Sequence, residues 1–154
     1  MERDDELLTP TVGTTRRRSE RPWRLGSQFW VAFFGGPLAA ALVGYLNGSR
    51  LGIPERAKRW MVAAGIGGLG LAVALAVAIV SFDVDVGARL ANQMAGVVTY
   101  GATYKLQRSG DRVYQFYGED EEAYDSLWGP GLALVLGAGI PSALLIAGVM
   151  AGIE

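Results

Sequence analysis

The stretch from Trp60 to Phe82 constrains the fold of this chain more than any other. Its 23 residues include no charged residue and no proline. A helix on a soluble domain pairs an apolar face with a polar one, whereas a helix that is apolar on every face is typical of a lipid environment. At a rise of about 1.5 Å per residue it is about 34 Å long, enough to cross a hydrocarbon core of ~30 Å. The stretch therefore predicts a transmembrane helix.

The composition excludes several kinds of chemistry. The chain has 154 residues, of which 51% are hydrophobic, and it contains neither cysteine nor histidine. Disulfides, thiolate or imidazole metal sites and Ser-His catalysis are therefore excluded. We expect a protein that is not an enzyme and that has no metal or cofactor. The net charge of -1 gives no field that would recruit nucleic acid, so we expect no nucleic-acid partner.

Residues 1–27 are polar and irregular, which is typical of a disordered tail. A basic cluster lies just before the first hydrophobic segment. It consists of Arg16, Arg17, Arg18, Arg21 and Arg24. Such a cluster signals membrane topology, and it also favours contact with anionic lipid headgroups.

Besides the stretch from Trp60 to Phe82, the chain has three further hydrophobic segments, at about 28–47, 86–106 and 128–153. The segment at 28–47 is the first in chain order. Their blocks of apolar residues predict an all-α, polytopic integral membrane bundle of four segments. Residues 107–127 form a polar loop with an acidic run and several tyrosines in this interpretation. Helix breaks are expected at Gly35-Gly36-Pro37 and at Pro141, because proline removes a backbone donor and clashes with the preceding turn.

Small residues recur at a spacing of four in each segment, so that each helix has one face of small side chains. The four ladders are Gly36, Ala40, Gly44 and Gly48; Ala64, Gly68, Ala72 and Ala76; Gly87, Ala91, Ala95, Thr99 and Thr103; and Gly139, Ala143, Ala147 and Ala151. Small faces let helices approach closely in lipid. We expect them to pack within the chain, with contacts in a homo-oligomer or a larger membrane complex as the alternative.

The basic residues do not orient a bundle of four straight spans. Six lie before the first segment and seven lie on the opposite side, although cytoplasmic loops normally hold the excess. If the break at Gly35-Gly36-Pro37 makes the first segment re-entrant, thirteen fall on one side and none on the other, with Arg89 set aside inside its helix. Dual insertion as antiparallel dimers is the other resolution. Four spans remain the first expectation and the re-entrant form the second.

A candidate polar site lies at the start of the third segment. It comprises Asp85, Arg89, Asn92 and Gln93. Arg89 follows Asp85 by four residues, so the two pair on one helix face, either as an interfacial ion pair or as part of a seam that faces a substrate. Whether Arg89 faces the bundle interior or the headgroups separates these two interpretations.

The stretch from Phe29 to Ala40 resembles a segment of small bacterial multi-span membrane proteins of unassigned function, in which a Gly-Pro-containing first segment precedes a short basic loop. The resemblance covers about residues 23–82 and implies a bacterial inner-membrane location, with no catalytic residues. The function expected first is a non-enzymatic scaffold or accessory subunit that acts through helix packing and the cytoplasmic basic tail. The alternative is a small transporter or channel-like protein with a polar seam at Arg89, Asn92 and Gln93.

Overall fold

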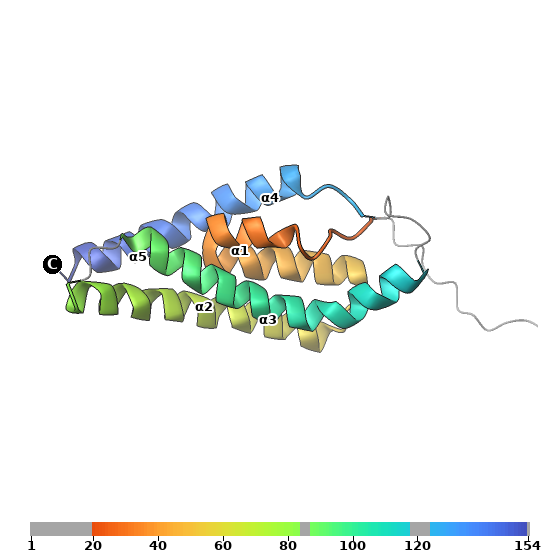
Figure 1. Cartoon of the computed structure of the whole chain (residues 1–154), viewed down its shortest axis with the longest axis horizontal. Helices are drawn as coiled ribbons and strands as arrows, with labels where there is room; N and C mark the ends of the chain where they lie inside the picture. The colour runs from red at the N-terminus through yellow and green to blue at the C-terminus, as the bar shows by residue number, and fades with distance from the viewer. Residues whose placement is uncertain (1–19, 84–86, 118–123, 154) are drawn as a thin grey trace, which may run out of the picture.

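The computed structural model describes residues 20–83, 87–117 and 124–153, and every regular element in this part of the chain is a helix (Figure 1). The elements are α1 (Gln28–Leu51), α2 (Glu55–Ser81), α3 (Ala88–Tyr117), α4 (Trp128–Leu134), the π-helical turn η3 (Val135–Gly139) and α5 (Ile140–Ala151). The last three follow one another without interruption and act as one long helix (Figure 1).

The helices α2 and α3 form an antiparallel pair that runs the length of the bundle (Figure 1). Fully buried alanines of both helices pack together between them, and Ile146 of α5 packs against these alanines. These alanines are Ala72, Ala76, Ala91 and Ala95. Gly68 completes the contact, because a Cβ there would lie 2.0 Å from the Thr99 hydroxyl. Close approach of backbones replaces the large side chains of a soluble core.

The helix α1 is a hairpin of two helical arms. At Gly36 the backbone has φ 72° and ψ -164°, which ends the first arm, residues 28–35, and Pro37 begins the second, residues 37–51. The arms run back to back, so both ends of α1 lie at the same end of the bundle (Figure 1). The side-chain amide of Asn47, near the end of the second arm, bonds to both backbone groups of Trp23, ahead of the first arm.

Three helical stretches are long and apolar enough to cross a membrane, namely α1, α2 and the continuous stretch Trp128–Ala151. The expectation of four such spans is therefore wrong. The third segment, α3, falls below this hydropathy because it is amphipathic: Asn92, Thr99, Thr103 and Gln107 are buried, whereas its outward positions carry residues such as Met94 and Val98. This inward polar face lowers the mean hydropathy of α3, and the exposed Arg89, Lys105, Arg108 and Arg112 toward its two ends lower it further.

Residues 107–117 were expected in a loop, but they continue α3. The polar side chains that suggested a loop are partly buried and bonded. The Gln107 amide exchanges hydrogen bonds with Gln28, and Asp111 accepts hydrogen bonds from Tyr124 and Gln115. Gly110 does not end the helix, because it packs against Ile53. The acidic run at 119–122 lies outside the described residues.

Pro141 was expected to break the last segment, but the helix continues through it. Proline removes the N–H that would bond four residues back. The chain accommodates the loss by widening into the π-helical turn η3 just before Pro141, which then stands in the first turn of α5. The irregularity therefore precedes the proline.

Residues 20–27, expected as the end of a disordered tail, pack against the bundle. Trp23 is buried, bridges to Asp125, and carries the Arg50 guanidinium 4.0 Å above its ring centroid. Arg50 also forms ion pairs with Glu20 and Asp125. The indole N–H of Trp23 finds no acceptor within the described part of the chain. Residues 1–19 lie outside the described residues.

Candidate binding site at the tip of the α1 hairpin

The tip of the hairpin lies midway along the bundle, where α3 and η3 approach it at glycines. A Cβ on Gly36 would lie 2.2 Å from the Asn92 amide oxygen of α3, and one on Gly139 of η3 would lie 2.7 Å from the Gly35 Cα. A Cβ on Gly96, also on α3, would lie 2.2 Å from the carbonyl oxygen of Ala32. Each approach is possible only because the residue lacks a side chain.

Two buried polar side chains meet beside the tip. Asn92 on α3 is 4% exposed and Ser142 on α5 is 2% exposed. The Ser142 hydroxyl donates a hydrogen bond of 2.9 Å to the Asn92 amide oxygen. Polar groups are costly away from water unless they are bonded, so this pair marks a specific polar point in an apolar bundle.

The helix breaks give this point further polarity. The last carbonyls of the first arm of α1 lose their usual N–H partners at Gly36, and Pro37 has no N–H to offer. The positive end of the second arm begins at the same place. The π-helical turn η3 ends there as well, at Gly139. Two irregular backbone segments therefore meet against Asn92, an arrangement that can orient a small ligand by hydrogen bonds and dipoles.

A groove of about 510 Å³ leads to this point between α3 and the η3–α5 stretch. Its lining is mostly apolar. The lining residues are Phe34, Arg89, Asn92, Gln93, Val135, Gly139, Ile140, Ala143, Leu144 and Ala147. Ile140 and Leu144 on its wall are at least half exposed, so the groove opens on the side of the bundle. Arg89, in the first turn of α3, stands at the end of the groove farthest from the hairpin's open end.

Three of the four ladders of small residues are buried, and the fourth is mostly exposed beside this groove. Those of α1 and α3 are buried within the chain apart from Gly87, and the α2 ladder is buried apart from the half-buried Ala64. In the fourth ladder only Gly139 is buried, whereas Ala143, Ala147 and Ala151 are exposed. The expected packing within the chain therefore holds for three segments, and the fourth ladder borders the groove instead.

The groove contains some of the polar residues that the sequence predicts as a site, but not all of them. Arg89, Asn92 and Gln93 share the groove, whereas Asp85 lies outside the described residues. Arg89 is exposed at the helix end, which fits the interfacial interpretation, and it is Asn92 that reaches the interior. Of the predicted basic cluster, Arg21 and Arg24 are exposed near the open end of the hairpin, and Arg16, Arg17 and Arg18 lie outside the described residues.

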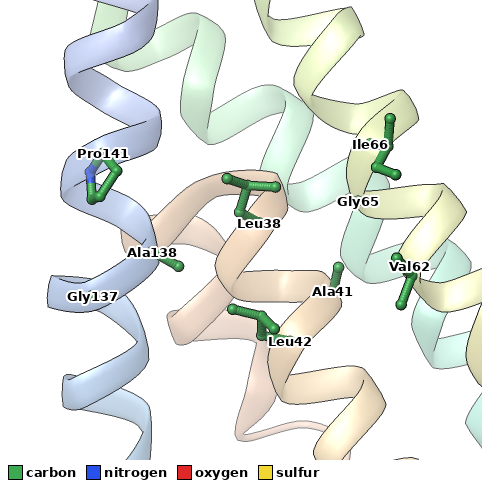
Figure 2. Close-up of a pocket in the computed structure, with 9 residues that line it drawn as sticks. All are labelled: Leu38, Ala41, Leu42, Val62, Gly65, Ile66, Gly137, Ala138 and Pro141. Carbon is green, nitrogen blue, oxygen red and sulfur yellow. The ribbon is translucent and has the colours of Figure 1, made fainter.

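A second pocket, of about 310 Å³, lies on the other side of η3 between α2 and the second arm of α1 (Figure 2). Leu38 and Leu42 of α1 and Ile66 of α2 face it, and Pro141 borders it from α5 (Figure 2). Its lining contains no polar side chain, so it offers shape without hydrogen bonds.

Sequence reasoning missed Ser142 and the glycine contacts of the tip. Ser142 is the single hydroxyl side chain of residues 128–153, and that isolation was the available signal. The amides of Gln28, Asn47 and Gln107 were missed as well. They form a buried network at the open end of the hairpin, in which Gln107 accepts a hydrogen bond of 2.8 Å from Asn47.

The site has polar amides, one hydroxyl and one guanidinium, but no carboxylate or other general base among its lining residues. The amides and the guanidinium can donate hydrogen bonds to a bound ligand. The resemblance to small bacterial membrane proteins stays a prediction. A scan of protein-family models, a search of curated proteins and a search of solved structures each gave no match to this chain.

Proposed function

We propose that the chain is an integral membrane protein in which α2, α3 and the α4–η3–α5 stretch cross the bilayer and α1 forms a re-entrant hairpin. The arms of α1 are about 12 and 22 Å long at 1.5 Å per residue, too short to span a ~30 Å core singly. Most residues of α1 are buried, as a re-entrant backbone requires. The inward polar face and outward apolar face of α3 suit a span packed against the hairpin.

The basic residues support a cytoplasmic location for the open end of the hairpin. In the described part of the chain, every lysine and arginine except Arg89 lies toward that end. These residues are Arg21, Arg24, Arg50, Arg56, Lys58, Arg59, Lys105, Arg108 and Arg112. The excess follows the positive-inside rule, and it favours contact with anionic headgroups in a bacterial inner membrane.

Within this topology the hairpin-tip site supports a small transporter or channel-like protein. The observation that carries this proposal is the meeting of the α1 break with η3 against the buried Asn92. Discontinuous helices that end near the middle of a bilayer mark solute sites in membrane transporters, and π-helical turns are frequent at functional sites. Asn92 would bind the solute, and the freed carbonyls before Gly36 would orient it.

Flux through proteoliposomes that contain the full chain tests this proposal. The probes are Rb⁺, Cl⁻ and fluorescent phosphatidylglycerol, which represent a cation, an anion and a bilayer amphiphile. We expect at least one probe to cross, and Asn92→Leu to slow it roughly tenfold, because one lost hydrogen bond of about 1.4 kcal/mol gives that factor. Ser109→Leu, at an exposed position of the same helix, should leave the flux unchanged. Absence of any flux would reject transport.

A scaffold or accessory subunit is the second candidate, and the outer face of α2 favours it. Ala63, Gly67, Gly70 and Ala74 are exposed there, and the space around both glycines is open. Small residues on a lipid-facing helix permit close contact with a helix of another chain or a second copy. If no probe crosses while Gly67→Leu abolishes co-purification of a membrane partner, the scaffold is the better assignment.

A further inference from the structure

The groove that leads to Asn92 is reached from the side of the bundle. Its wall residues Phe34, Ile140 and Leu144 are 54, 50 and 67% exposed, and they lie on the surface that faces lipid in the proposed topology. A ligand that enters the groove therefore comes from the bilayer. Its apolar part would lie over Ala143 and Ala147, whose small side chains create the space.

The charge of the groove selects the other part of the ligand. Arg89 is its single charged lining residue, and no carboxylate of the described residues forms an ion pair with it. Gln93 stands beside Arg89 and offers amide donors. The α3 helix begins one residue before Arg89, so its positive dipole end adds to the same potential. An apolar groove with one cationic end is complementary to an anion that carries a hydrocarbon chain.

We infer that the groove binds one anionic phospholipid of the non-cytoplasmic leaflet. Its phosphate lies at Arg89, and one acyl chain runs along Ala143 and Ala147 toward Gly139 and the hairpin tip. This inference rests on the proposed function, since it names the ligand class of the same site. It gives Arg89 the role of selecting for headgroup charge, and it gives the exposed fourth ladder the role of an acyl-chain track.

Native mass spectrometry of the purified full chain tests the inference, with phosphatidylglycerol and phosphatidylcholine of identical acyl chains as probes. We expect one tightly bound phosphatidylglycerol and a preference of roughly tenfold over phosphatidylcholine, because the choline cation of phosphatidylcholine repels Arg89 and offsets the attraction of its phosphate. Arg89→Gln should abolish the preference, whereas Arg89→Lys should keep part of it. Arg112→Gln, an exposed arginine at the other end of α3, should keep all of it.

A second variant tests the groove itself. Ala143→Phe fills the acyl-chain track from an exposed position, and Ala74→Phe adds the same ring at an exposed position of α2 outside the groove. We expect only Ala143→Phe to remove the bound lipid. If it weakens binding of both lipids while the wild type shows no charge preference, the anionic assignment falls and the site stands. If both variants bind lipid as the wild type does, the site falls as well.

Discussion

At Gly36 the backbone enters a region of φ and ψ that is almost restricted to glycine, and the chain reverses there. The same residue brings the backbone against the Asn92 amide, where no side chain fits. Gly52 adopts positive φ too, but as an ordinary left-handed helix cap after α1. Two constraints, conformational and steric, therefore coincide at Gly36.

The substitution Gly36→Ala should destabilise the protein by more than the roughly 1–3 kcal/mol that backbone strain alone costs. The added Cβ must also displace Asn92. Gly67→Ala is the matched control, because the space around Gly67 is open and its helix should gain about 0.5–1 kcal/mol. Thermal unfolding in detergent, followed by intrinsic fluorescence, measures both variants. Equal midpoints for the two would contradict the hairpin geometry.

Tyr124 adds a pH-dependent contact near the open end of the hairpin. Burial, and then the nearby Asp111 carboxylate to which it donates a hydrogen bond of 2.9 Å, raise the pKa of its phenol above the usual value. The folded pKa exceeds the unfolded one, so the contribution is complete below about pH 10 and is lost as the pH rises through the folded pKa. We expect the unfolding midpoint to fall less steeply between pH 9 and about 11 in Tyr124→Phe. Parallel pH profiles for wild type and variant would count against this role.

The hairpin α1 is held at both ends by α3. At the tip the contacts are glycines and Asn92, and at the open end they are the amides of Gln28, Asn47 and Gln107. Gln107 occupies the centre, since its oxygen accepts from both other amides and its nitrogen donates to Gln28. A fully bonded network of this kind fixes the position of one element on another.

Gln107→Leu should therefore loosen the hairpin rather than unfold the bundle. It leaves the Gln28 amide without its partner and removes one partner from Asn47, at a cost of about 1–3 kcal/mol for each group left unsatisfied. Hydrogen exchange followed by mass spectrometry should show faster exchange in residues 28–35 and little change in α2. Ser109→Leu, exposed on the same helix, is the control. Uniform acceleration over all helices would show that the network supports the whole fold instead.

Across the whole molecule the hairpin decides the topology. A straight α1 would place its two ends at opposite ends of the bundle, whereas the hairpin returns the chain to the end from which it came. In the described part of the chain, the nine basic residues other than Arg89 then lie toward one end of the bundle, as the positive-inside rule requires of the proposed topology.

Cysteine accessibility distinguishes these topologies, because the chain contains no natural cysteine. Single cysteines at Ser19, Ser49, Ser109 and Ile153 are labelled with a membrane-impermeant maleimide in intact cells. We expect the first three to be protected and Ile153 to react. Reaction at Ser19 with protection at Ser49 would indicate a straight first span, and half-labelling at every position would indicate dual insertion.

The sequence by itself determined that this chain has helices long and apolar enough to cross a membrane, that Gly35-Gly36-Pro37 breaks the first helix, and that small residues bring α2 and α3 together. These are local properties: hydropathy, backbone freedom and side-chain size act within a few residues of one another. Only the tertiary structure decided that the break is a reversal, because the direction of the second arm depends on what buries it. The partners that bury and bond it, Gln107 for Gln28 and Ser142 for Asn92, are 79 and 50 positions away.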